Sequence, residues 1–379
     1  METAPFLLLE LCLWIASILT AIHFLRLGRI SKKENIQPPL SQPVSIIITT
    51  HEQCDLLRKN LPLILAQDFS AGYEVIVVDM LSTDDTQNYL ERMEEDYPYL
   101  HHTSIPSTAR DISMHRLALT LGVRSACYEW LVFTNADCQP SGSGWLSALT
   151  SHCTETVDAV LGFTRYADVK GWNACRCQFF RLWQQMLWLP CARHHAPYRA
   201  DGSCLCYRKS IFLNHHGFAS HANLIAGAET LMVNQNIRKK RCSINVHPEA
   251  ITIQEIPQKR FWSQERLFFM ETREHMRHTF LYRIWYAMNA CTPVLYTLCT
   301  LALCIYFIPN PYVLIPLVLF WIIQHVCSIV CFNYTARQMG ISPFIFSFPW
   351  MLHRIPCWDI QAWLAHRFTK KQTFRKKFV

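Results

Sequence analysis

The sequence predicts an α/β domain with a mostly parallel sheet, accompanied by apolar segments long enough to cross a membrane. Runs of β-branched residues of strand length alternate with amphipathic helical segments, which is the pattern of strands joined by crossover helices. Hydrophobic residues make up 51% of the 379-residue chain and gather at its two ends. Residues 43 to 258, between these ends, have the composition of a soluble domain.

Three runs are predicted to be buried strands of the sheet, at residues 44–49, 73–79 and 129–133. The second ends in Asp79, and the third continues into a polar tip that holds Asn135 and Asp137 before Pro140. A strand that ends in a carboxylate places it at the rim of the sheet, where open α/β folds bind ligands. The helical segments between the strands include residues 56–67 and 110–125.

Several function classes are disfavoured by composition. The net charge is +8, but the basic residues cluster locally and do not form one patch of the nucleic-acid-binding type. The chain lacks GxGxxG and GxxxxGK[ST], so neither a dinucleotide fold nor a P-loop is indicated. The 17 cysteines are scattered and include CxC pairs at 175–177 and 204–206. We interpret them as buried free thiols in a reducing compartment, with zinc binding as the second alternative.

Three apolar runs are predicted to cross a membrane. Residues 6–25 are long enough to span a bilayer and lack both a basic start and a cleavage site, which favours a permanent anchor over a cleaved signal peptide. Basic residues at 26–33 follow directly and place the next segment in the cytoplasm. Residues 287–308 and 312–332, separated by a short turn at Pro309, predict a helical hairpin, because core helices this long and this poor in charge are uncommon.

The expected organisation has five parts. Residues 1–30 form the anchor, 43–258 the α/β domain, and 286–333 the hairpin. Residues 259–285 mix aromatic and arginine side chains, which predicts an amphipathic helix docked on the membrane surface. Residues 343–379 are predicted to form interfacial helices and a basic tail suited to anionic lipid headgroups.

Several motifs together resemble those of inverting family 2 glycosyltransferases of the GT-A fold, of the membrane-anchored bacterial type. Residues 44–52 are similar to the family opening VSVIIPTYNE, and EVIVVDMLSTDDT at 74–86 resembles EVIVVDDGSTDDT. Ala109-Arg110-Asp111 resembles the family's ARN, and residues 134–138 resemble the DADC form of its DxD motif. Glu229 falls where the family carries an acidic segment. The resemblance covers roughly residues 43–270.

The resemblance implies a nucleotide-sugar donor at the sheet edge and a divalent metal, Mg²⁺ or Mn²⁺, held by Asp137. Asn135 stands where the family usually has an aspartate, which removes one negative charge from the metal and nucleotide site. His51 would stack on the base or remain solvated, and Arg110 would support the diphosphate or remain solvated. The implied nucleotide-binding residues are Thr50, His51, Glu52, Asp79, Arg110, Asn135 and Asp137.

The resemblance also implies a general base and an acceptor side. Inversion needs a carboxylate that takes a proton from the acceptor hydroxyl, and Glu229 is the acidic residue of its segment, although the family usually uses aspartate there. The acceptor or diphosphate side is expected to include Gly202, Ser203, Gln264 and Arg266. Three residues also have ordinary structural interpretations: Asp137 as a turn cap, Glu229 as a surface charge near a helix start, and Arg266 as a membrane-surface contact.

These expectations describe a multi-pass enzyme of the inner (cytoplasmic) membrane with its catalytic domain in the cytoplasm. It would transfer a sugar from a nucleotide-sugar donor to a lipid-linked or polysaccharide acceptor, in contact with membrane lipids and without nucleic acid. The alternative is a catalytically weak or inactive nucleotide-binding scaffold of the same fold, motivated by Asn135 and by the thin acidic segment around Glu229. A transport role is poorly supported, because the apolar runs carry almost no charges.

Overall fold

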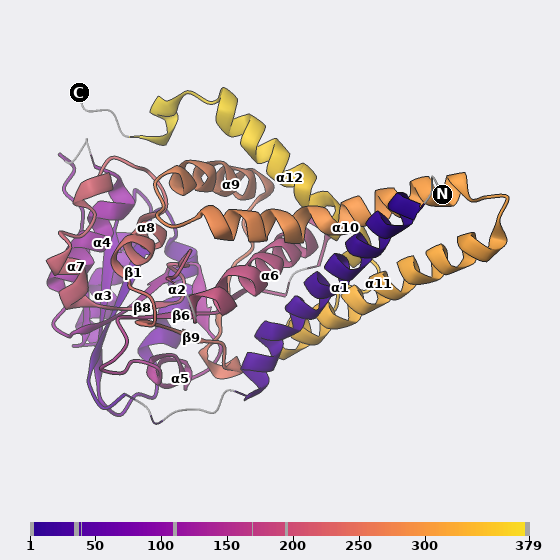
Figure 1. The fold of residues 1–379 in the computed structure, drawn as a ribbon. Coiled ribbons are helices and arrows are strands. Elements are labelled where there is room, and N and C mark those ends of the chain that lie inside the picture. The colour runs from indigo at the N-terminus through magenta and orange to yellow at the C-terminus, as the bar shows by residue number, and fades with distance from the viewer. Residues whose placement is uncertain are drawn as a thin grey trace.

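The computed structural model describes residues 4–33, 38, 40–108, 112–168, 170–193 and 196–375. A central sheet with helices on both faces forms the α/β part, and three long helices extend from it to one side (Figure 1). The α/β part contains β1 (Val44–Thr50), α2 (Cys54–Leu65), β2 (Tyr73–Asp79), α3 (Thr86–Asp96), β3 (Leu100–Ser104), α4 (Met114–Ser125), β4 (Trp130–Asn135), β5 (Cys138–Pro140), α5 (Trp145–Thr150), β6 (Ala159–Gly162), β7 (Thr164–Tyr166), α6 (Trp172–Ala192), β8 (Leu205–Arg208), α7 (Lys209–Asn214), α8 (Ala228–Asn236), β9 (Cys242–Asn245) and β10 (Thr252–Gln254).

The main sheet has seven strands in the order β3-β2-β1-β4-β8-β6-β9. Strands β3, β2, β1 and β4 run parallel, whereas β8 is antiparallel to both β4 and β6. A small second sheet has the order β5-β10-β7. The predicted α/β fold with a mostly parallel sheet is therefore confirmed.

Alternating side chains of the parallel strands bury two separate cores. On one face, Ile46, Ile48 and Val75 pack with residues of α2, α3 and α5. On the other face, Ile47 and Val78 belong to a larger cluster that includes α4, α6 and α8. This larger cluster continues without a break into the helices outside the α/β part, so the sheet and those helices share one core.

Among the described residues, three helices are long and apolar enough to cross a membrane: α1 (Ala4–Lys33), α10 (Phe280–Tyr306) and α11 (Pro311–Gln338). They lie against one another on one side of the domain (Figure 1). Much of their apolar surface is exposed, as in Phe320 and Leu298, which is what a helix surrounded by lipid presents. Polar contacts join them inside, where Gln324 donates a hydrogen bond of 2.6 Å to Ser17 Oγ.

Helix α6 connects the α/β part to these helices. Its Phe179 ring lies 4.9 Å from Phe332 of α11 and 5.8 Å from Phe348, measured between ring centroids. Phe348 begins α12 (Phe348–Phe368), which packs on α9 (Lys259–Glu274) and on α10. These contacts therefore hold the α/β part at a fixed position relative to the apolar helices.

The segment expected to form one amphipathic helix at 259–285 is divided between α9 and the start of α10, with a break at 275–279. No proline or glycine causes this break. The Asn234 side chain of α8 accepts a hydrogen bond from the Arg277 N–H at 2.7 Å and donates one to the Arg277 carbonyl at 3.3 Å. These side-chain contacts satisfy backbone groups that would otherwise form the hydrogen bonds of a continuing helix.

Candidate active site at the carboxyl edge of the sheet

The parallel strands bring their polar ends to one edge of the sheet. Thr50 of β1 is paired in register with Asp79 of β2, and Thr49 is paired with Asn135 of β4. Neighbouring strands lie about 5 Å apart, so these two pairs of residues lie close together at the same edge of the sheet. Thr50 is fully buried, and its Oγ1 has no hydrogen-bond partner within the described chain.

The loops after β1 and β2 are tied together around Asp79. Its carboxylate accepts hydrogen bonds from the Ser82 N–H at 3.0 and 3.3 Å, and Ser82 Oγ in turn accepts one from the Glu52 N–H at 2.9 Å. Glu52 adopts a positive φ of 53° and accepts a 2.7 Å hydrogen bond from the Thr83 N–H. His51 is exposed beside them. Glu52 therefore fixes the geometry of the two loops, while the His51 side chain is exposed to solvent.

Asn135 links the strand edge to the segment before β8. Its Oδ1 accepts a hydrogen bond from Thr49 Oγ1 at 3.3 Å, and its Nδ2 donates to Ser203 Oγ at 3.2 Å. The Ser203 N–H donates to Asp201 Oδ1 at 3.1 Å, which fixes the turn at 201–204. Both polar ends of the Asn135 amide are therefore used to position the sheet edge against this turn.

Asp137 lies just beyond β4 and is held by a residue of the small sheet. Gln254, at the end of β10, donates from Nε2 to Asp137 Oδ2 at 2.8 Å. The other end of the same amide, Oε1, accepts a 2.6 Å hydrogen bond from Arg181 of α6. Burial raises the pKa of the Asp137 carboxyl, an effect that the Gln254 and Cys138 hydrogen bonds and the charge of Arg181 only partly offset.

Glu229 occupies the first turn of α8 and is paired with a histidine from α4. Its Oε1 lies 2.7 Å from His115 Nε2, and its side chain is only 13% exposed. Burial alone would raise the pKa of Glu229, but the charge and hydrogen bond of His115, with a smaller effect from Arg116, lower it overall. Burial alone would lower the pKa of His115, and its pairing with Glu229 raises it overall. The pairing therefore favours the ionised form of both groups.

Two glycines allow close approaches around Glu229. A Cβ on Gly202 would lie 2.4 Å from Glu229 Oε1, so the carboxylate rests directly on the backbone of the turn at 201–204. Gly227, before α8, has a φ of +76° and faces Thr272 of α9, whose Cγ2 would lie 2.3 Å from an added Cβ. Arg116 reinforces this entry to the helix by donating to the Leu224 and Ala226 carbonyls at 2.8 and 2.9 Å.

A continuous series of contacts thus runs across the site. Asn135 contacts Ser203, and the adjacent Gly202 contacts Glu229. Asp137 is joined through Gln254 to Arg181, which pairs at 3.8 Å with Asp201 of the same turn. These contacts place the candidate metal ligand and the candidate base on the same edge of the sheet.

One carboxylate of this site has the chemistry of a metal ligand, because Asp137 keeps oxygen lone pairs beyond its two hydrogen bonds. Mg²⁺ is commonly held by one or two carboxylates together with phosphate oxygens, so a single aspartate fits that mode of binding. The one group of three His, Cys, Asp or Glu ligands found in the described chain lies elsewhere, at Glu271, Glu274 and His366. Glu271 there is already paired with His366 at 2.8 Å, which indicates a structural contact between α9 and α12.

The remaining predicted residues fall in different places. Arg110 lies outside the described residues. Arg266 is on α9 and donates to Asp359 of α12 at 3.0 Å, and Gln264 is half-buried on the same helix. His115, Gln254 and Arg181 were not predicted, because single polar residues on helices or strand ends carry no distinguishing pattern in one sequence.

Comparison with solved structures supports the fold. The chain is similar to the mannosyltransferase PcManGT from Pyrobaculum calidifontis in complex with GDP-Man and Mn²⁺, with a TM-score of 0.54 and 17% identity over 96% of this chain and 99% of that one. It is also similar to S. aureus TarS 1–349, with a TM-score of 0.43 and 16% identity over 89% of this chain and 94% of that one.

Comparison with known sequences identifies the domain. No curated protein sequence matches this chain. Residues 45–213 match the family model described as Glycosyl transferase family 2, and this segment contains β1 to α7 together with Asp79, Asn135, Asp137 and the turn at 201–204. The resemblance seen in the motifs is confirmed over this segment, and the chain has the GT-A fold of such glycosyltransferases.

Proposed function

We propose that this protein is a membrane-bound inverting glycosyltransferase that moves a sugar from a nucleotide-sugar donor to a lipid-linked or polysaccharide acceptor at the cytoplasmic face. The observation that supports it most directly is the convergence of Asp137 and Glu229 on the turn at 201–204. Gln254 links Asp137 to Arg181, Arg181 pairs with Asp201 at 3.8 Å, and the adjacent Gly202 contacts Glu229. The family match supports glycosyl transfer as the reaction class.

The donor nucleotide would bind over the ends of β1, β2 and β4. The unpartnered Thr50 hydroxyl, the Asp79 carboxylate and the exposed His51 ring offer contacts for a base and ribose there. Asp137 would hold a divalent metal next to the diphosphate. A bound metal would neutralise the charge that develops on the diphosphate as the sugar leaves.

Glu229 would act as the general base. A carboxylate of lowered pKa is ionised at neutral pH and can accept a proton from an acceptor hydroxyl during in-line attack. His115 would orient this carboxylate and balance its charge, and Gly202 leaves it room to face the donor side. Inversion follows from a single displacement with no covalent intermediate.

The apolar helices support a membrane location. Three helices are long and apolar enough to span a bilayer, and the basic residues after the first of them favour a cytoplasmic catalytic domain. The larger core of the domain continues into these helices, which would hold the site close to the membrane surface.

The test is turnover by the purified full-length protein with Mn²⁺ and a panel of nucleotide sugars. Glu229→Gln should keep nucleotide binding, measured by calorimetry, and should lower kcat by roughly 10²- to 10⁴-fold, the contribution of a general base. Glu91→Gln, at an exposed position on α3, is the matched control. Unchanged turnover in Glu229→Gln would exclude the assigned role. Nucleotide binding without turnover for every donor and acceptor would favour the inactive scaffold.

A further inference from the structure

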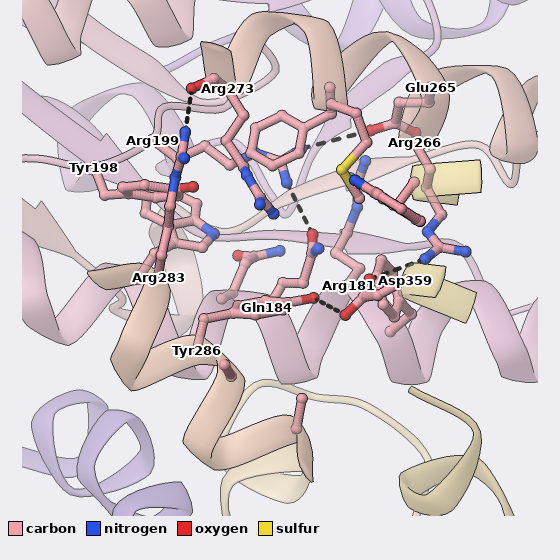
Figure 2. A pocket seen from close by; sticks show the side chains of 18 of the residues that line it. Arg181, Gln184, Tyr198, Arg199, Glu265, Arg266, Arg273, Arg283, Tyr286 and Asp359 are labelled. Carbon is pink, nitrogen blue, oxygen red and sulfur yellow. Dashed lines mark hydrogen bonds and ion pairs between the residues drawn. The ribbon is translucent and has the colours of Figure 1, made fainter. Parts of the chain in front are cut away.

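We propose that the cavity enclosed by α6, α9, α10 and α12 binds the phosphate-bearing head group of a lipid acceptor. The inference rests on the proposed function, because it assigns the acceptor class for the same site. The cavity has a volume of about 330 Å³ and lies on the side of the domain where the candidate membrane helix α10 begins. Side chains from all four helices converge on it (Figure 2).

The wall of the cavity carries an excess of positive charge. Five arginines line it, against three carboxylates. The arginines are Arg181, Arg199, Arg266, Arg273 and Arg283, and the carboxylates are Asp201, Glu265 and Asp359. A cavity with two more cations than anions is suited to a ligand that brings about two negative charges, which is the charge of a phosphate monoester near neutral pH.

Three of these arginines are already engaged by the carboxylates. Arg266 pairs with Asp359 at 3.0 Å, Arg199 with Glu265 at 3.6 Å, and Arg181 with Asp201 at 3.8 Å. Arg199 also lies over the Phe269 ring, 4.3 Å from its centroid. These contacts hold the three guanidinium groups in place as part of the cavity wall and partly neutralise their charge.

The other two arginines form no ion pair with any carboxylate of the described chain. Arg283 donates to the Arg273 carbonyl at 2.7 Å, and this contact draws the two residues together without neutralising either charge. Arginine presents a planar fork of donors that matches two phosphate oxygens. Arg273 and Arg283 are therefore the groups expected to contact the phosphate directly.

Much of the remaining lining of the cavity is apolar and aromatic, and part of it extends along α10 and α12. Ala290 and Cys291 of α10 and Ile360 and Trp363 of α12 contribute to it. Ile360 and Trp363 are also exposed at the outer surface of α12. An anionic head among the arginines with an apolar tail along α10 and α12 satisfies both parts of the lining, whereas a free polysaccharide would leave the apolar part unused.

The inner end of the cavity meets the candidate active site. Asp201 lines the cavity, and the next residue, Gly202, contacts Glu229. Arg181 lines it too and is hydrogen-bonded to Gln254, which holds Asp137. A head group bound there would therefore be delivered to the edge of the sheet where the donor sugar is expected.

Binding is tested with dodecyl phosphate added to the full-length protein in non-ionic dodecyl maltoside micelles. Dodecanol supplies the same tail without the phosphate, and inorganic phosphate supplies the charge without the tail. Dodecyl phosphate should bind more tightly than either. Arg273→Gln should weaken its binding roughly tenfold, the loss expected for one hydrogen bond to a charged group, and Arg283→Gln should do likewise. Arg260→Gln, at an exposed position on α9 outside the cavity, should leave it unchanged.

Equal binding of dodecyl phosphate and dodecanol, or unchanged binding in both Arg273→Gln and Arg283→Gln, would overturn the proposal. Inorganic phosphate that binds as tightly as dodecyl phosphate would overturn the lipid assignment. Nucleotide binding and unfolding temperature, measured on each variant, show that the fold is retained. Donor turnover without dodecyl phosphate binding would refute this inference alone, whereas dodecyl phosphate binding without turnover for any donor would refute the proposed function alone.

Discussion

The carboxylate of Glu229 rests against the backbone of Gly202, so closely that a Cβ at position 202 would lie 2.4 Å from Oε1. This contact joins the start of α8 to the turn that also carries Ser203, the partner of Asn135. Placement of the candidate base therefore depends on a residue without a side chain.

We predict that Gly202→Ala lowers kcat by about 100-fold, because the added methyl group must push the Glu229 carboxylate away, and a displacement of about 1 Å at a reacting group has an effect of that size. Donor affinity should change little, since the nucleotide contacts lie on the strands. Steady-state kinetics and calorimetry measure both quantities. Gly142→Ala, where an added Cβ meets nothing within 4 Å, is the control. A normal kcat in Gly202→Ala would contradict the assigned geometry.

We predict that His115→Gln shifts the acid limb of the kcat–pH profile to higher pH. The charge and hydrogen bond of His115 lower the pKa of Glu229, whereas burial raises it. Without the imidazolium, the effect of burial on the pKa of Glu229 is opposed less, so this pKa rises in the folded protein. Glu229 is then protonated at a higher pH than in the unchanged protein. His215→Gln, at an exposed position on the C-terminal side of α7, should leave the profile in place. A purely structural histidine would lower the rate at every pH without moving the limb.

We predict that Asp137→Asn raises the Mn²⁺ concentration needed for half-maximal turnover. The substitution removes the charge of the one carboxylate proposed to bind the metal, while its side-chain oxygen can still accept from Gln254 Nε2. Turnover as a function of Mn²⁺ and direct Mn²⁺ binding by calorimetry provide the measurements. Asp68→Asn, an exposed aspartate, is the control. If both variants respond to Mn²⁺ alike, Asp137 is not a metal ligand.

The sequence was sufficient to predict features that depend on local pattern. β-branched runs predicted the parallel strands. The polar residues at two of their ends, Asp79 and Asn135, lie on the two sides of β1 at the same edge of the sheet, because parallel pairing in register aligns both with the end of β1. The long apolar runs likewise correspond to helices of membrane-spanning length. Both patterns, the β-branched runs and the apolar runs, involve residues that are close together in the sequence.

Features that depend on contacts between distant segments were not predictable. The pairing of His115 with Glu229 joins residues 114 positions apart, and nothing in either segment indicates it. The break between α9 and α10 arises from Asn234 on α8, not from a helix-breaking residue. The arginine-lined cavity is assembled from four helices, so its charge became visible only when the fold brought them together.

The C-terminal segment contacts the loop that leads into α8, and this gives a final prediction. Phe374 is almost fully buried and packs against Phe268 of α9 with ring centroids 5.6 Å apart. The Ile225 N–H donates to the Phe374 carbonyl at 3.1 Å, and Leu224 pairs with Arg375 in an isolated bridge. The tail is therefore packed against the approach to Glu229.

Phe374→Ala should loosen this contact, at a cost of about 3 kcal/mol, because the removed ring leaves a cavity that a terminal segment can only partly close. Hydrogen exchange should show loss of protection at the Ile225 amide, and kcat should fall more than donor affinity, because the loop before Glu229 becomes mobile while the strand edge is untouched. Phe368→Ala, at the end of α12 and 83% exposed, should change neither. Full protection at Ile225 in Phe374→Ala would mean that the loop is held by Arg116 alone, whose hydrogen bonds to the Leu224 and Ala226 carbonyls do not involve the tail.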